Sequence, residues 1–428
     1  MESKAVPHKD DKDKLIKYFS VEIDNMLRWL ASFGAEPDGG VTRLLYSEAW
    51  KKAQQALYGK MKQFGLTPEF DDVGNLFGRL QGTEVRPKAI LTGSHIDTVK
   101  NGGRYDGAFG IVAAIIALRY LKDKYGVPKR TLEAVSLCEE EGSRFPVTYW
   151  GSGSMTGHHD FGKITSLKDD QGIYFQKAMA TAGFGPHTHR SSRRSDIGAF
   201  IELHVEQGMV LERTGGTIGI VNAIVGQKRF TFEVTGQANH AGTTPMPWRK
   251  DAMNGASAMI QFLYETAGMR GEPLVATVGK LEAEPNIANV IPGRVTFTAD
   301  IRHPDQAALD DFCRVVSIRF REIAQERGLE LQTSMWMDEQ PVCMHKGLSE
   351  RIRSVSEACG IPCVQMVSGA GHDAQMFQPC FPTALIFVPS RLGISHSPDE
   401  YTAPEDLAAG TVVLTKMLYL LGYQEEDV

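Results

Sequence analysis

The 428-residue sequence lacks the features that mark secreted, membrane or disulfide-stabilised proteins. Its 6 cysteines are irregularly spaced and include no CxxC pair, which indicates packed, reduced thiols. The most apolar stretch, Ile111–Leu118, is far shorter than the roughly 20 residues that a membrane-spanning helix needs. The first residues are polar and charged, without the apolar segment of a secretory signal. We therefore expect a cytoplasmic protein that does not bind membranes.

The chain also has no excess of positive charge. The chain has 46 Lys and Arg against 52 Asp and Glu, a formal net charge of −6 at pH 7. This balance gives no electrostatic attraction to nucleic acid or anionic lipid, so we expect a small-molecule substrate and no nucleic-acid partner. The chain is also too long for one compact hydrophobic core, so we expect two domains.

The order of apolar segments predicts an α/β domain. A strand that ends near His95, an apolar helix after Gly107 and an apolar run at Leu132–Leu137 form the strand–helix–strand unit of a largely parallel sheet. The other elements expected in this domain are helices over residues 13–32, 47–64 and 404–421 and strands over 69–73, 75–80 and 383–389.

The middle of the chain predicts a different domain. Strands over 229–235, 274–281, 294–301 and 330–336 and helices over 250–266 and 305–327 follow the βαββαβ order of a ferredoxin-like domain. Because the chain then returns to α/β character, this domain is inserted. We expect a catalytic domain over residues 1–216 and 338–428 and an inserted domain over 217–337.

Two segments have the residue types of a metal site. In SHIDTVKNGGRYDGAFG, His95 and Asp106 flank a Gly-rich turn at the end of a strand, where ligands collect in α/β sheets. Asp97 is placed to orient the His95 imidazole, or it merely caps a turn. In SLCEEEGSRF, three glutamates follow a strand. They form either a solvated surface run or a metal ligand beside a general base.

Further histidines fall mostly at the ends of expected strands. His204 lies in ELHVEQG, His372 in SGAGHDAQMF and His396 in GISHSPDE. A single histidine is commonly an ordinary core or surface residue, but together with the carboxylates this set could bind two divalent ions that share a bridging carboxylate. In the inserted domain His240 lies on a turn, and Arg302 is either a surface ion pair or a receptor for a substrate carboxylate.

Together these segments resemble the di-metal aminoacylase and carboxypeptidase superfamily, and within it the ureido-hydrolysing branch. The similarity extends from GGVTRLLYSEAW to GISHSPDEYT and includes EEEGSRFPVTYWGS and NHAGTTPM. It implies a zinc-peptidase-like catalytic domain with a mixed, largely parallel sheet. It also implies that the inserted domain acts as a lid and as the contact surface of a homodimer.

The resemblance implies the metal ligands and the base. His95, Asp106 and His204 would hold one divalent ion, and Asp106, Glu141 and His396 the second. Glu140 would be the general base. Peptidase members have one more residue before the glycine, and that register would shift the two glutamate roles to Glu139 and Glu140.

The resemblance also implies the remaining site residues. Asp97 and His240 would assist catalysis, with His240 reaching into the partner's site to stabilise the oxyanion. Asn289 and Arg302 would hold the substrate carboxylate. The full set of implied substrate contacts is Gln207, Gln227, His240, Asn289, Arg302 and His372.

The implied reaction is hydrolysis of a ureido group by a metal-bridged hydroxide, with release of ammonia and carbon dioxide. Allantoate is the expected substrate and ureidoglycine the remaining product, a step of purine catabolism. N-carbamoyl-L-amino acids are the close alternative, whereas His204 and the EEG register disfavour a peptidase or aminoacylase. The ligand types suit Mn²⁺, Zn²⁺, Co²⁺ or Ni²⁺, and the resemblance favours Mn²⁺.

Overall fold

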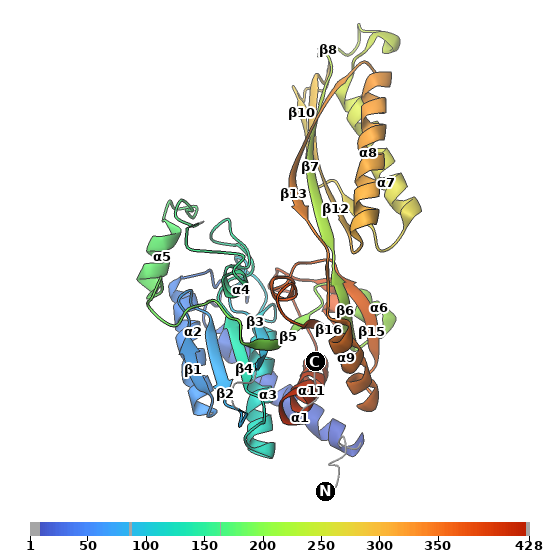
Figure 1. Ribbon diagram of the computed structural model, residues 1–428. Coiled ribbons are helices and arrows are strands. Elements are labelled where there is room, and N and C mark those ends of the chain that lie inside the picture. Colours follow the sequence, from blue (N-terminus) through green and yellow to red (C-terminus); the bar gives the residue numbers. More distant parts are fainter. Residues whose placement is uncertain (1–8, 85–87, 163, 425–428) are drawn as a thin grey trace. The chain divides into compact units, whose positions relative to one another are not determined.

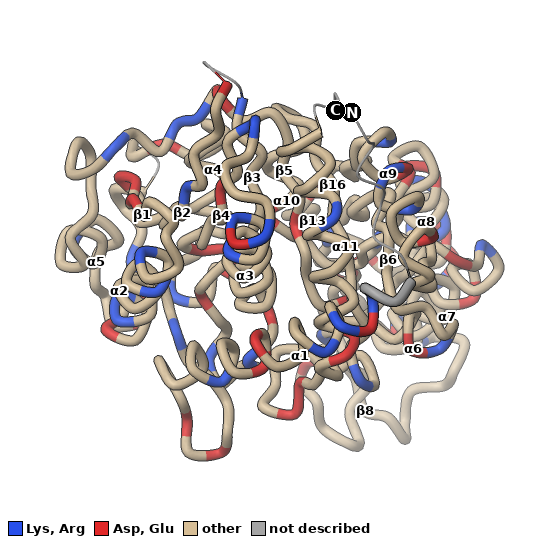
Figure 2. The backbone as a smooth tube through the Cα atoms, turned by 90° about the horizontal axis from the view of Figure 1, so that it is seen from below, with Lys and Arg blue, Asp and Glu red and all other residues tan. Residues whose placement is uncertain are grey.

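The computed structural model describes residues 9–84, 88–162 and 164–424 (Figure 1). The chain divides into two compact units, one formed by Met1–Asn222 with Met344–Val428 and the other by Ala223–Cys343. Lys and Arg are interspersed with Asp and Glu along the described chain (Figure 2). None of the described helices has the length and apolar character needed to cross a lipid bilayer.

The first unit is built on a mixed sheet whose strand order is β1-β2-β4-β3-β5-β16-β6. Its centre, β4, β3, β5 and β16, is parallel, and β1, β2 and β6 run antiparallel to their neighbours. The strands are β1 (Thr67–Phe70), β2 (Leu76–Leu80), β3 (Ala89–His95), β4 (Leu132–Leu137), β5 (Ile197–Val205), β6 (Ile218–Ile224) and β16 (Thr383–Val388), with β15 (Cys363–Ser368) paired to β6. The short strand β14 (Val342–Cys343) pairs with the last two residues of β6, and these four residues fall in the second unit.

The central βαβ unit expected from the sequence is confirmed, because β3, α3 (Ala108–Tyr125) and β4 follow one another and the two strands pair in parallel. Helix α3 is buried over most of its surface, since it packs on β3 and is also contacted by α1 (Lys9–Ala31) and α11 (Pro404–Tyr423). Such two-sided burial explains why its sequence is apolar all round rather than on one stripe.

Local signals place the other helices of this unit. Helix α2 (Glu48–Gln63) begins after Ser47, whose side chain accepts a hydrogen bond from the Trp50 amide. Helix α11 begins with Pro404 in its first turn, as expected. The remaining helices of this unit are α4 (Trp150–Thr156), α5 (Phe175–Ala182), α6 (Val210–Thr214), α9 (Lys346–Ala358), α10 (Ala374–Phe377) and the 3₁₀ turn η2 (Arg391–Gly393).

The second unit has the expected ferredoxin-like order. Its antiparallel sheet runs β10-β12-β7-β13, and β9 also pairs with β12. Helices α7 and α8 pack together and on this sheet around a core that includes Phe232, Phe297 and Phe320. The elements are β7 (Gly226–Thr235), β8 (Asn239–His240), η1 (Met246–Trp248), α7 (Ala252–Arg270), β9 (Val275–Thr277), β10 (Leu281–Glu284), β11 (Val290–Ile291), β12 (Arg294–His303), α8 (Gln306–Glu326) and β13 (Glu330–Glu339).

One expected strand is wrong in detail. The strand expected over 274–281 is two short strands, β9 and β10, which pair with different parts of β12. The interruption contains Gly279. A glycine weakens a strand interior because it has no side chain to pack and loses more backbone entropy.

Candidate metal centre and active site

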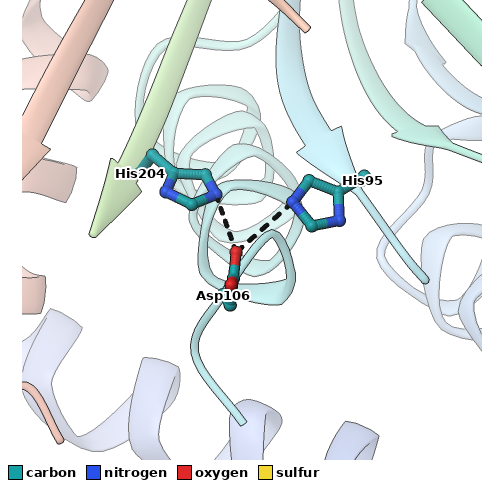
Figure 3. Close-up of side chains that lie close together, drawn as sticks. All are labelled: His95, Asp106 and His204. Atoms are coloured by element: carbon teal, nitrogen blue, oxygen red, sulfur yellow. Dashed lines mark ion pairs between the residues drawn. The ribbon is translucent and has the colours of Figure 1, made fainter. Parts of the chain in front are cut away.

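The candidate site lies at the carboxyl ends of the central parallel strands of the first unit. His95 is the last residue of β3, and His204 stands near the end of the neighbouring strand β5. Asp106 lies in the turn that leads into α3. Its Oδ1 is 3.4 Å from His95 Nε2 and 3.2 Å from His204 Nε2. Both imidazoles point at this carboxylate (Figure 3).

This first group fits a divalent ion. All three residues are buried, and Asp106 Oδ1 is a buried atom without a hydrogen-bond donor in the described chain. Ligand atoms bound to a tetrahedral ion at about 2.0–2.1 Å lie about 3.4 Å from one another. The separations of 3.2–3.4 Å are therefore those of donors that share one ion.

A second group uses the other oxygen of the same carboxylate. His396 Nε2 lies 3.3 Å from Asp106 Oδ2 and 3.2 Å from Glu141 Oε1. The ligand atoms of these three residues fall within 4.8 Å of one another. Asp106 thus presents one oxygen to each group, which is the arrangement of a carboxylate that bridges two ions.

The three glutamates point in different directions. Glu140 and Glu141 offer oxygens to a group with His95, and Glu141 also joins Asp106 and His396. Glu139 instead accepts a hydrogen bond from the Gly142 amide and belongs to none of the ligand groups among the described residues. Of the three glutamates, Glu140 and Glu141 therefore belong to candidate ligand groups, and Glu139 does not.

Asp97 connects the two loops that carry these groups. Its carboxylate accepts the backbone N–H of Glu140 at 3.0 Å and of Glu141 at 3.1 Å. Asp97 Oδ1 also lies 3.3 Å from His95 Nδ1. One fully buried carboxylate therefore orients a candidate ligand and fixes the backbone of the two glutamates.

The charges of the site are strongly coupled. Although burial acts in the opposite direction, the imidazoles of His204, His396 and His95 hold the pKa of Asp106 well below its ordinary range. Hydrogen bonds that His396 donates to Asp106 and Glu141 raise the pKa of its imidazole from 6.5 to about 10. The carboxylates therefore attract cations, and the histidines hold protons where cations are absent.

Glu140 is buried, and its carboxyl holds a proton more readily than that of an exposed glutamate. Burial raises the pKa of its carboxyl well above the ordinary value, although the nearby His95 acts to lower it. A carboxyl that must take up a proton and then release it works best with a pKa closer to neutral pH than that of an exposed glutamate.

Two predicted substrate contacts of the first unit also lie at this site. The Gln207 side-chain amide donates to Asp106 Oδ2 at 2.9 Å and to Ser395 Oγ at 3.1 Å. His372 is buried, with its ring 4.7 Å from that of His204 and its Nε2 3.1 Å from Ser368 Oγ. Burial and the nearby His204 lower the pKa of His372 well below 6.5, so this ring is neutral.

The predicted contacts of the second unit form two separate pairs. Gln227 and Arg302 face each other across β7 and β12, and both bind Asp300, at 2.7 and 2.9 Å. Arg302 therefore makes the ion pair that the sequence left as an alternative. His240 and Asn289 meet instead where β8 pairs with β11, and the Ala241 amide donates to the Asn289 carbonyl at 3.0 Å.

The two pairs belong to opposite ends of the sheet. Gln227 pairs with Arg302 at one end of β12, whereas its other end, Arg294, pairs with Thr235 beside the β8–β11 loops. Arg302 lies eight residue steps along the strand from Arg294, about 26 Å at 3.3 Å per residue. The structure therefore does not bring the two pairs of one chain together.

Several buried site residues escaped the sequence analysis. Glu202 stands two residues before His204 on β5 and accepts hydrogen bonds from Ser94 Oγ and the Ala374 amide, both at 2.8 Å. An acidic residue inside the apolar run AFIELHV was a signal for it. Arg43, buried beneath the His95–Asp97 turn, donates to the Ile96 carbonyl, and no spacing rule points to it.

Comparison with known proteins agrees with this geometry. The model of peptidase family M20/M25/M40 matches residues 91–420. The chain belongs to this family. Allantoate amidohydrolase of Bacillus subtilis (strain 168) is 49% identical over 401 residues, 94% of this chain and 97% of that protein. Allantoate amidohydrolase of Escherichia coli (strain K12) is 47% identical over 411 residues, 96% of this chain and 100% of that protein.

A solved structure extends the comparison to the fold. The amidase of the hydantoinase/carbamoylase family from Burkholderia multivorans superposes with a TM-score of 0.89 at 35% identity, over 93% of this chain and 97% of that chain. The superfamily and the fold class expected from the sequence are therefore confirmed.

Proposed function

We propose that this protein is a metal-dependent amidohydrolase that cleaves the ureido group of allantoate to ureidoglycine, ammonia and carbon dioxide. The observation that carries the proposal is the Asp106 carboxylate, which offers one oxygen to each of two ligand groups beside Glu140. Two full-length relatives near 48% identity that are named for allantoate support this substrate.

Two divalent ions fit the residues present. His95, Asp106 and His204 would hold one ion, and Asp106, Glu141 and His396 the other. When bound, such ions polarise a carbonyl and make water acidic enough to act as a nucleophile near neutral pH. We propose Mn²⁺ for the active enzyme, because the second group has more oxygen than nitrogen donors, with Zn²⁺, Co²⁺ and Ni²⁺ as further candidates.

The proton transfers belong to Glu140 in this proposal. A ureido carbonyl is a poor electrophile because two nitrogens donate into it, so attack needs a group that removes the water proton. Glu140 would accept that proton and give it to the leaving nitrogen. Asp97 would hold Glu140 and His95 in register through the contacts described above. His240 would donate to the oxyanion, an interaction typically worth about 3–4 kcal/mol.

The spacing within the second unit supports a homodimer. A small ureide cannot reach both the Gln227–Arg302 pair and the His240–Asn289 pair across about 26 Å of strand. If all four residues contact substrate, each active site must receive the two pairs from two different chains. We therefore propose that the inserted unit, expected over 217–337, supplies the dimer contact and acts as a lid.

The test is ammonia release from allantoate and from an N-carbamoyl-L-amino acid, measured in parallel after chelation and after Mn²⁺ is restored. We expect activity on allantoate that is lost with the chelator and regained with Mn²⁺. Preference for the N-carbamoyl-L-amino acid would change the proposed substrate but not the proposed metal centre. The similarity to a carbamoylase-family structure makes this substrate the second candidate. No ammonia from either substrate with metal bound would refute the proposal.

A further inference from the structure

A bridging carboxylate poses a positioning problem. Gln207 donates to Oδ2 of Asp106, but Oδ1 has no hydrogen-bond donor in the described chain. If Asp106 gives one oxygen to each ion, the place of its side chain therefore depends largely on its backbone. Asp106 and Tyr105 each direct a backbone N–H at one oxygen of Glu400. The Tyr105 amide lies 2.9 Å and the Asp106 amide 3.2 Å from Glu400 Oε2. Glu400 is buried, with 5% of its surface exposed.

The other Glu400 oxygen reaches the same carboxylate through a serine. Ser395 Oγ lies 3.4 Å from Glu400 Oε1 and 3.3 Å from Asp106 Oδ2. Glu400 also stands four residues after His396, a ligand of the second group, and its amide donates to the Ser397 carbonyl at 3.1 Å. One glutamate therefore links the turn that carries Asp106 to the loop that carries His396.

The Gly-rich turn is shaped to admit this glutamate. A Cβ atom on Gly103 would lie 1.9 Å from Glu400 Oε2, closer than any non-bonded contact. The close approach of Glu400 therefore explains why the second glycine of NGGRYDG, Gly103, has no side chain, and the sequence alone did not show this. Gly103 lets a carboxylate from a segment almost 300 residues away press against the turn.

We propose that Glu400 is a positioning residue, which sets the place of Asp106 and couples it to the His396 loop so that both ions find preformed ligands. This inference rests on the metal centre proposed above. The proposed role depends on the length of the Glu400 side chain rather than on its charge, because the side chain accepts hydrogen bonds from the backbone N–H groups of Tyr105 and Asp106. A mere charge role would instead require only that an anion lie near the ions.

Two conservative substitutions separate reach from charge. Glu400→Asp keeps the charge but withdraws the carboxylate by one methylene, whereas Glu400→Gln keeps the length and one acceptor oxygen but loses the charge. We expect Glu400→Asp to weaken Mn²⁺ binding about 10–100-fold, as loss of ligand-orienting contacts typically does. Glu400→Gln should lose clearly less. Glu405→Gln, an exposed glutamate on the same segment, is the matched control and should bind as the parent does.

The readouts are the Mn²⁺ dissociation constants by calorimetry, the number of ions retained after dialysis and the metal-induced rise in melting temperature. Gly103→Ala approaches the same contact from the other side and should reproduce the loss seen for Glu400→Asp. Circular dichroism of the metal-free variants checks that they fold. The test uses the conservative Asp and Gln variants because Glu400→Ala, which removes the whole side chain, could prevent folding.

Parent-like Mn²⁺ binding by Glu400→Asp, or a larger loss for Glu400→Gln than for Glu400→Asp, would overturn the inference. These outcomes differ from a failure of the proposed function. If the unmodified protein binds no divalent ions, the metal centre itself is wrong. If it binds two ions and Glu400→Asp binds them equally well, only the positioning role is wrong.

Discussion

Replacement of Asp97 by Asn tests whether one buried carboxylate organises the site. The substitution preserves shape but exchanges one acceptor oxygen for an NH₂ donor. In the structure the two Asp97 oxygens accept separate N–H groups, from Glu140 and Glu141, and one of them also faces His95 Nδ1. Asparagine can keep only one of these N–H partners, and its NH₂ must then face the other donor.

The size of the effect follows from these contacts. One buried N–H left without an acceptor costs about 1–3 kcal/mol. The surviving bond loses its charge assistance, which accounts for roughly half of such a bond's strength. We therefore expect Asp97→Asn to lower the free energy of unfolding of the metal-free protein by about 2–4 kcal/mol. Because His95 and the glutamate loop shift together, turnover should fall about 10–100-fold or more.

The assays are urea denaturation of the metal-free protein, Mn²⁺ affinity and kcat for allantoate. Asp170→Asn is the control, since that carboxylate is 88% exposed and pairs with Lys100 at 3.4 Å. Unchanged stability and kcat in Asp97→Asn would refute the reasoning. Lower stability with parental Mn²⁺ affinity and kcat would instead reduce Asp97 to a turn cap, the alternative that the sequence left open.

The other expectations concern single groups. Glu140→Gln should lose nearly all turnover yet retain two ions, as checked by kcat and metal analysis. Arg302→Ala should mainly raise KM for carboxylate substrates, and an unchanged KM would remove it from anion binding. In chelated protein the pKa of His396 is raised to about 10 by Asp106 and Glu141. The stabilising effect of the protonated His396 is complete below pH 6.5 and is lost as pH rises toward 10, so the melting temperature of the chelated protein should fall over this range. The melting temperature of the Mn²⁺-loaded protein should fall less over this range, because bound ions take the place of the protons.

Much of the fold was predictable because apolar periodicity is local. The segments that form β3, α3, β4 and α11 are rich in apolar residues, so their sequences alone indicate that they are buried. The break between β9 and β10 was only partly predictable: Gly279 marks a weak point in the strand, but the part of β12 with which each piece pairs is set by the folded sheet. Strands β5 and β6 and the segment through α4 and α5 mix apolar and polar residues, so their pattern alone assigned no element.

The first ligand group was also predictable in outline. His95 and Asp106 flank one turn at the end of an expected strand, which brings these two together. His204 joined them through the family resemblance, because the pattern of β5 assigned no strand. The choice between Glu139 and Glu141 was not local. It depends on the direction in which a buried loop turns, and that is set by the hydrogen bonds that the Glu140 and Glu141 amides donate to Asp97, more than 40 residues earlier.

The hardest parts are those in which two distant segments share one group. His396 is half exposed and adopts a left-handed backbone, so by itself it has the character of an ordinary loop residue. It becomes a candidate ligand only because the second oxygen of Asp106 faces it, and Asp106 is held there by Glu400 from the same late segment. Two of the candidate ligands of the first group, His95 and Asp106, flank a turn that the sequence pattern identifies. The candidate ligands of the second group include His396, whose loop is placed only by contacts in the folded chain, so sequence patterns identify the second group less directly than the first.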